Sequence, residues 1–286
     1  MGQFLSLAIG SLVFLAQASP VDEADQSRAV AAIKELGAKV EFDRDAPGKP
    51  VVGVDFNRTK VSDAGLVHLQ GLKDLQELYL NDTAITDAGL ECLKGLKQFF
   101  FLQLGHTKVT DKGIAHIMGL SQLREILLDG TEVTDAGLAP LKKLPQLQTL
   151  YLNGTKIGDA GLNNLRGAPS LQMLYLKGTR ISDEGLAHLE GLPRLDWLDL
   201  SDTAITDAGL AHLKKLRRLK ILILSGTRVS RARVLGLRNQ LPNTKIISDP
   251  QVEPFPSILQ FPLALHPSHP TLRHSHPPLD SVGEVC

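Results

Sequence analysis

Apolar residues recur along the chain with a period of 24 residues, from about residue 51 to residue 246. Within one period, Leu78 and Leu80 occupy alternate positions, which predicts a strand with one buried face. Leu90, Leu93 and Leu96 are spaced three residues apart, which predicts one buried side of a helix. Each period is therefore expected to form a strand, a turn and a helix.

Three polar or small residues keep the same period. Thr recurs from Thr59 to Thr227, Asp from Asp63 to Asp207, and a Gly follows two residues after each Asp. Each Asp follows Ser, Thr or, once, Gly and precedes the helical segment, so we expect it to cap the N–H groups of that helix. The Thr hydroxyl is expected to satisfy backbone groups of adjacent turns, and the Gly to let neighbouring helices approach closely.

No single unit can cover its own apolar face, so the units are expected to stack into a solenoid. The repeated L-x-x-L-x-L-x-x-T-x-I-T-D-A-G-L-x-x-L-x-x-L resembles leucine-rich repeats, specifically the bacterial 24-residue type with T-D-x-G-L in every unit, over residues 51–248. The resemblance implies an α/β horseshoe with a concave parallel β-sheet and convex helices. About eight repeats are expected, including a degenerate C-terminal cap, with about eight strands lining the concave side.

The segments outside the repeats differ in composition. Residues 1–18 are uncharged, contain an apolar run and end in small residues, which predicts a secretory signal peptide, with an uncleaved N-terminal anchor as the alternative. The protein is therefore expected to be exported to the periplasm, the cell envelope or the outside, and a cytoplasmic location is less favoured. Contact with a membrane is expected only if this segment is uncleaved.

Residues 19–50 are expected to form an N-terminal cap made of a helix and a short strand. Val30, Ile33 and Leu36 fall on one side of that helix and are expected to cover the first repeat. Residues 249–286 are rich in Pro and His and have no repeat phase, which predicts a disordered tail that is either a genuine linker or a reading-frame relic.

Charge and cysteine content narrow the class of protein. The 286 residues include 31 Lys or Arg and 31 Asp or Glu, and this balance argues against a nucleic-acid-binding protein. Two Cys cannot form the disulfide framework of a small secreted scaffold. No nucleophile elbow, metalloprotease motif or nucleotide-binding loop is present, so we expect a protein that is not an enzyme and needs no cofactor.

A column of His and Cys residues on the helical side raises the possibility of a zinc site. Its members are His68, Cys92, His116, His188 and His212. Neighbouring helices pack about 8–10 Å apart, whereas zinc holds its ligands at about 2.0–2.3 Å, so a solvated convex surface is the favoured interpretation.

The candidate binding site lies at strand positions that point away from the core, because side chains alternate along a strand. All three Tyr and the single Trp fall there. Tyr and Trp are enriched where binding energy concentrates, although lateral packing between cross-strand neighbours is the alternative. The candidate binding residues are Tyr79, Phe101, Leu127, Tyr151, Met173, Tyr175, Trp197, Ile221, Ile223, Glu125, Asp129, Lys177 and Asp199.

Within this set, Tyr151, Tyr175 and Trp197 are expected to be the central anchors, and the charged residues to set the polarity around them. The sequence therefore predicts a module that binds a protein or peptide through the concave face. Binding of a carbohydrate or cell-envelope polymer is the alternative. A substrate-adaptor role in ubiquitin ligases, whose repeats are similar, is less favoured because no F-box is recognisable before the repeats.

Overall fold

The computed structural model describes residues 20–248. The predicted signal peptide and the predicted tail, residues 249–286, lie outside the described residues. Within the described part, strands and short helices alternate along the chain, as the change of hydrophobic period predicted.

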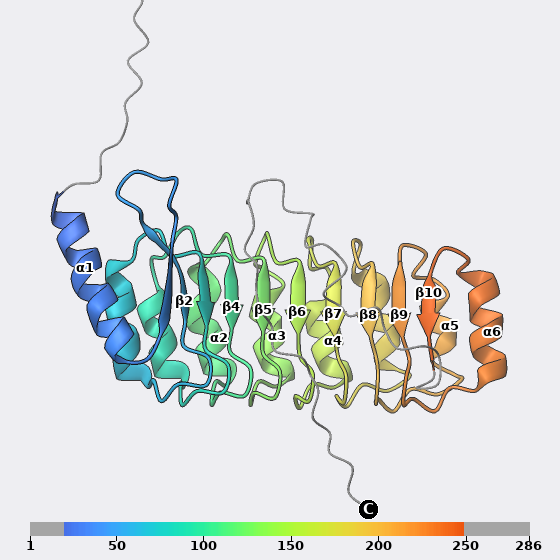
Figure 1. Cartoon of the computed structure of the whole chain (residues 1–286). Helices are drawn as coiled ribbons and strands as arrows, with labels where there is room; N and C mark the ends of the chain where they lie inside the picture. The colour runs from blue at the N-terminus through green and yellow to red at the C-terminus, as the bar shows by residue number, and fades with distance from the viewer. Residues whose placement is uncertain (1–19, 249–286) are drawn as a thin grey trace, which may run out of the picture. The chain divides into compact units, whose positions relative to one another are not determined.

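Ten strands form one open sheet, in which each strand lies beside the next strand along the chain (Figure 1). Strand β1 is antiparallel to β2, and every later pair is parallel with partners 24 residues apart, such as Leu150 and Leu174. The strands are β1 (Lys39–Phe42), β2 (Val51–Asp55), β3 (Glu77–Tyr79), β4 (Phe101–Gln103), β5 (Glu125–Leu127), β6 (Thr149–Tyr151), β7 (Met173–Tyr175), β8 (Trp197–Asp199), β9 (Ile221–Ile223) and β10 (Lys245–Ile247).

The parallel sheet is one strand longer than the sequence pattern indicated. Among the described residues nine strands run parallel, because the degenerate last unit still contributes β10, which pairs with β9. Asn243 and Ser248 replace the Leu that the repeat has at their positions, but Ile246 keeps the buried middle position of the strand, so β10 still pairs with β9.

The helices all lie on one face of the sheet (Figure 1). Seven of the ten described helices have seven residues or fewer, and four are 3₁₀ helices, which are usually short. They are α1 (Pro20–Glu35), η1 (Asp63–Gly71), η2 (Asp87–Leu93), α2 (Asp111–His116), η3 (Ile117–Gly119), α3 (Asp135–Leu141), α4 (Asp159–Leu165), η4 (Gly185–Gly191), α5 (Leu210–Leu213) and α6 (Arg231–Gln240).

The core is a stack of apolar layers between the sheet and these helices. The middle residue of every three-residue strand in β3–β9 is fully buried, as are the Leu or Ile residues on the inner side of the helices. Each layer is covered by the layers on either side, so one contiguous core runs through the described repeats.

Helix α1 packs against η1 at the N-terminal end of the repeats. Ile33 is fully buried there, as expected, and Leu36 is 37% exposed although its side chain still lies against Gly65 of the first repeat. The helix ends at Glu35, and Gly37 with φ of 90° turns the chain after it.

Each recurring Asp bonds to the repeat that follows it. Asp111 accepts hydrogen bonds from the backbone N–H and the hydroxyl of Thr134, at 2.7 and 2.6 Å. Five other Asp residues form the same two bonds, and Asp135 forms only the backbone bond because Gly158 has no hydroxyl. We call these seven residues the Asp ladder: Asp63, Asp87, Asp111, Asp135, Asp159, Asp183 and Asp207.

This arrangement corrects the expectation that each Asp caps its own helix. The N-cap is the Ser, Thr or Gly before the Asp in five of the seven repeats that contain the Asp. Thr86 and Thr110 accept a hydrogen bond from the backbone N–H of the residue two positions later. The Asp charge still lies in the first turn, where it suits the helix dipole. Its hydrogen bonds, however, join one repeat to the next.

The recurring Gly provides the space for this carboxylate. A Cβ placed on Gly89 or Gly113 would lie 2.5 Å from the carboxylate oxygen of Asp63 or Asp87 in the preceding repeat. A Cβ on Gly185 would overlap the carboxylate of Asp159, which supplies its three nearest atoms. The Gly is therefore required by the Asp of the neighbouring repeat, which is a more specific role than the close helix approach that we expected.

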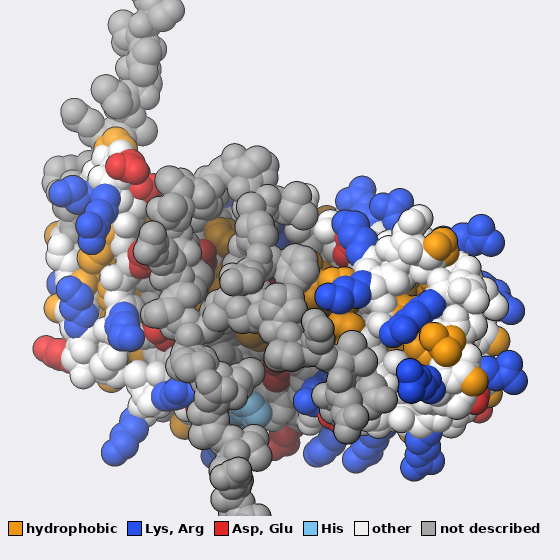
Figure 2. Space-filling model, turned by 45° about the vertical axis from the view of Figure 1, so that its right-hand side comes forward, with side chains coloured by type: hydrophobic (Ala, Val, Ile, Leu, Met, Phe, Trp, Pro, Cys, Tyr) orange, Lys and Arg blue, Asp and Glu red, His pale blue; other side chains and the backbone are white. Residues whose placement is uncertain are grey.

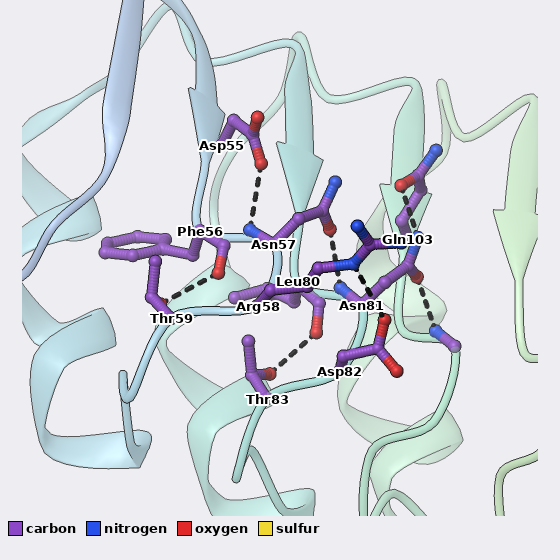
Figure 3. A network of polar contacts seen from close by, with 11 residues as sticks. Asp55, Phe56, Asn57, Arg58, Thr59, Leu80, Asn81, Asp82, Thr83 and Gln103 are labelled. Atoms are coloured by element: carbon purple, nitrogen blue, oxygen red, sulfur yellow. Dashed lines mark hydrogen bonds and ion pairs between the residues drawn. The ribbon is translucent and has the colours of Figure 1, made fainter. Parts of the chain in front are cut away.

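A second set of polar contacts joins the turns at the ends of the strands (Figure 3). Thr83 Oγ1 donates to the carbonyl of Leu80 within its own turn, at 2.6 Å, and not to an adjacent turn as expected. Asn81 connects this turn to the next one, because its Oδ1 accepts a hydrogen bond from the backbone N–H of Gly105 at 2.7 Å. These contacts fix the spacing of the turns that follow the strands.

The pairing of Asp159 with Gly185 can be tested by a double-mutant cycle. Gly185→Ala should lower the free energy of unfolding by about 2–3 kcal/mol, because the new Cβ overlaps the carboxylate. Asp159→Ala should cost about 1–3 kcal/mol through the bonds lost to Ser182. In the double variant the overlap is relieved, so the total cost should fall below the sum by about 1 kcal/mol or more. Urea unfolding measures all three.

Gly119→Ala is the matched control for this cycle, because no atom lies within 4 Å of a Cβ at that position. It should change the free energy of unfolding by less than about 1 kcal/mol. Additive costs for Asp159→Ala and Gly185→Ala would contradict the steric link between the two residues.

Candidate functional site

The face of the sheet opposite the helices is lined by the first and third residues of each strand. We call it the open face, since no helix of residues 20–248 lies over it (Figure 1). The in-register pairing places equivalent residues side by side, so the face consists of two columns that cross the strands. All the strand residues proposed from the sequence lie in these columns.

Three aromatic rings from neighbouring strands form one cluster. Tyr151 on β6 and Tyr175 on β7 are direct partners, and their rings stack with centroids 4.2 Å apart and planes inclined by 5°. Trp197 on β8 lies diagonally beside Tyr175, with centroids 6.0 Å apart and planes at 39°. We call Tyr151, Tyr175 and Trp197 the aromatic cluster. Such pairs contribute about 0.5–1.5 kcal/mol beyond area burial.

Apolar side chains extend this cluster across five strands. Leu127 is the in-register partner of Tyr151 on one side, and Met173 and Ile221 flank Trp197 on its two sides. Ile223 follows in the other column, beyond Asp199. The structure therefore brings together the residues that the sequence placed in one apolar stripe.

Tyr79 and Phe101 form a separate pair nearer the N-terminus, with ring centroids 5.1 Å apart. The hydroxyl of Tyr79 donates a hydrogen bond to the carboxylate of Glu77, and burial together with this negative charge raises the pKa of Tyr79. Strand β5 with Glu125 and Leu127 separates this pair from the aromatic cluster. The two therefore are not one continuous set of rings.

Glu125 contacts the aromatic cluster through a hydrogen bond with Tyr151. Burial raises the pKa of Glu125 to about 7, a hydrogen bond with Tyr151 acts in the opposite direction, and the charge of Glu77 raises it further. Burial also raises the pKa of Tyr175 to about 12. Near neutral pH the Glu125 carboxyl is thus divided between its neutral and charged forms, which is unusual for an acidic side chain.

The other charged residues of the predicted set have identifiable local contacts. Asp129 accepts a hydrogen bond from the backbone N–H of Asn153 at 2.7 Å, and Asp199 accepts from Ser201 at 2.8 Å. Lys177 Nζ lies 3.6 Å from the Asp202 carboxylate. Asp129 and Lys177 lie in the turns beyond the strand ends, so they border the open face and do not form part of its columns.

Two polar residues of the open face were missed as site candidates. Glu77 holds the Tyr79 hydroxyl, and the Gln103 carboxamide oxygen accepts from Asn81 at 2.6 Å. Their positions on the open face follow from the alternation along the strands, but polar side chains there lack the aromatic signal that marked the other candidates. They make the N-terminal part of the open face more polar than the part around the aromatic cluster.

No group of three or more His, Cys, Asp or Glu residues within residues 20–248 is arranged to hold a metal ion. In the same part of the chain, no helix has the length and apolar character needed to cross a membrane.

Comparisons with known proteins agree with this architecture. A family model described as a leucine-rich repeat matches residues 72–94 and 143–165. The solved structure of internalin C2 from Listeria monocytogenes str. 4b F2365 is similar, with 26% identity, a TM-score of 0.55, and coverage of 82% of this chain and 98% of that chain. No curated protein matches the sequence. The chain thus contains leucine-rich repeats, and they form an open, mainly parallel sheet flanked by helices.

The raised pKa of Glu125 predicts a pH-dependent stability. Because the folded chain holds this proton more tightly than the unfolded chain, stability present below the ordinary pKa of 4.5 should be lost as pH rises toward about 7. Glu125→Gln should remove that loss. Urea unfolding measures this effect: between pH 4.5 and pH 8, the free energy of unfolding of Glu125→Gln should rise by about 1–3 kcal/mol relative to that of the wild type.

Glu132→Gln is the control, because Glu132 is exposed in the turn that follows β5. It should leave the pH profile of the wild type unchanged. An identical profile for wild type and Glu125→Gln would show that Glu125 ionises normally in the folded protein.

Proposed function

We propose that this protein is a non-enzymatic module that binds another protein or a peptide through the open face. The observation that carries the proposal is the aromatic cluster, in which three large rings from three strands pack together on the side of the sheet away from the core. Tyr151 and Tyr175 are partly exposed, and Trp197 is 9% exposed beside them. None of the three belongs to the contiguous apolar core, which the middle residues of the strands help to fill. The leucine-rich repeat fold supports a protein-binding role.

The surroundings of the cluster indicate the chemistry of the partner. Leu127, Met173 and Ile221 continue the cluster as an apolar stripe, which favours an apolar or aromatic side chain of the partner. Glu125 at one border would become fully charged beside a cation, because an opposite charge lowers a carboxyl pKa. The partner that fits best is therefore a segment with an apolar anchor and a nearby Lys or Arg.

The remaining parts of the proposal concern location and chemistry. The apolar segment at residues 1–18 supports export, which the mass of the mature protein would test. An enzymatic role has no support in the described side chains, since the recurring acidic residues are engaged in bonds between repeats. Binding of a carbohydrate through the same rings is the alternative, because Tyr and Trp also stack on sugars.

The test is a crosslinking pull-down from exported and envelope fractions of the producing cells. The full-length wild type is compared with a Tyr151→Ala, Tyr175→Ala, Trp197→Ala variant whose folding is verified by its unfolding transition. The variant should lose the captured partner, with affinity reduced about 30-fold or more, because buried aromatic anchors are each worth about 2 kcal/mol or more. Sensitivity of capture to glycosidase treatment would favour the carbohydrate alternative.

A matched control removes three side chains from the helical side: Val67→Ala, His68→Ala and His188→Ala. It should capture the same partner as the wild type. Equal capture by wild type and the aromatic variant would show that the rings only pack against each other, and would move the binding site elsewhere.

A further inference from the structure

The zero net charge of the chain conceals a strong separation of charge. Residues 208–248 contain ten Lys or Arg and no Asp or Glu, whereas residues 20–207 contain twenty Lys or Arg and 27 Asp or Glu. The positive charge therefore belongs to the C-terminal end of the repeats, from α5 to β10. Figure 2 shows blue side chains gathered over this end.

The repeat provides an internal comparison for this charge. The loop that enters β9, residues 214–220, has the sequence KKLRRLK with five cations in seven residues. The equivalent loops at residues 70–76, 94–100, 118–124, 142–148, 166–172 and 190–196 contain one or two each. Leu216 and Leu219 of the basic loop are buried, as the repeat requires, so the extra cations occupy positions that the fold leaves free.

The basic side chains are exposed, and most are not neutralised. Lys215 forms an ion pair with Glu190 at 2.8 Å, and Lys220 with Asp196 at 2.7 Å. The other eight form no ion pair with any of residues 20–248. We call the ten residues the basic end: Lys214, Lys215, Arg217, Arg218, Lys220, Arg228, Arg231, Arg233, Arg238 and Lys245.

Part of the basic end is concave. A hollow of about 530 Å³ lies between the loop after α5 and the C-terminal turn of α6, lined by Lys214, Lys215, Arg217 and Gln240. Three of its four lining residues are cations. Such a hollow favours an anionic group, because several positive charges surround it at once.

A polar terminal repeat is needed to keep a solenoid soluble, but that need does not explain a single sign of charge. Mixed charges protect an end equally well, whereas like charges repel each other. Arg231 and Arg233 also lie in the first turn of α6, where the helix dipole disfavours cations and where the preceding repeats have Asp. The arrangement costs stability in the free protein, and an anionic ligand would recover it.

We propose that the basic end binds an anionic polysaccharide, a flexible chain carrying sulfate or carboxylate groups. Arg and Lys match these groups in geometry and charge. Clusters of five to eight Lys and Arg residues are typical of surfaces that bind heparin or nucleic acid. Most cations of the basic end lie on the loop at residues 214–220, around the hollow and on α6. A flexible chain can contact all three in succession, whereas a rigid ligand cannot.

Other anionic partners fit less well. Residues 208–248 contain no Phe, Tyr or Trp, so the basic end offers no platform on which single-stranded bases could stack. Duplex DNA is stiff over about 50 nm and would reach the outermost cations without entering the hollow. Within residues 208–248, Leu235 is the one exposed large apolar residue, at 50% exposure. A protein interface or a lipid surface needs more apolar area than this.

The test uses the full-length protein and heparin as the sulfated polysaccharide, with neutral dextran as the uncharged comparison. Heparin should bind with an affinity that falls steeply as salt rises, and dextran should not bind. Lys214→Gln, Arg217→Gln, Arg218→Gln should weaken heparin binding about tenfold or more and lower the slope of log Kd against log salt by roughly 2. Arg231→Gln, Arg233→Gln on α6 provides a second, independent variant with the same expected direction.

The matched control is Lys142→Gln, Lys143→Gln, Lys156→Gln, which removes three exposed charges elsewhere. Lys142 and Lys143 occupy the same repeat positions as Lys214 and Lys215, 72 residues earlier. The control should retain heparin binding within about twofold. Equal loss in the control, no binding of heparin, or tighter binding of duplex DNA, polyglutamate or anionic vesicles at the same salt would each overturn the proposal.

Discussion

The carboxylate of the recurring Asp accepts hydrogen bonds from the residue that precedes the helical Asp of the following repeat, and much of the remaining structure depends on this contact. Asp111 accepts two bonds from Thr134, and the Gly three residues after that Thr leaves space for the carboxylate. Three of the recurring residues of the repeat, the Asp, the Thr before the next Asp, and the Gly, therefore take part in one contact between neighbouring repeats. Loss of any of the three would weaken this contact between neighbouring repeats, as at Gly158, where only the backbone bond remains.

This contact lies on the helical side, and the Asn and Asp contacts at the strand ends fix the turns (Figure 3). Together with the apolar layers they account for the stacking of the repeats. The first and third positions of each strand lie outside these apolar layers, on the open face. In this protein they place Tyr151, Tyr175 and Trp197 side by side. A one-dimensional scaffold thus separates the residues that hold it together from those available for binding.

Two surfaces of opposite character result. The open face combines stacked rings with acidic groups such as Glu125, whose pKa is raised to about 7 by burial. The basic end carries ten cations and no anion over 41 residues. The two surfaces meet at β10, where Lys245 lies beside Ile221 in one column of the open face. The other nine cations of the basic end lie outside the strands, so an apolar ligand of the aromatic cluster and an anionic polymer at the basic end need not compete.

The sequence by itself determined the fold, because a change of hydrophobic period inside a fixed 24-residue unit allows only stacked strands and helices. It also determined which strand positions face away from the core, since alternation along a strand is local. The tertiary structure alone decided where the Asp carboxylates bond, why the Gly is needed, and that Tyr151 stacks on Tyr175 whereas Tyr79 belongs to a separate pair. These depend on contacts between residues about 24 positions apart, whose distances and angles arise only when one repeat packs on the next.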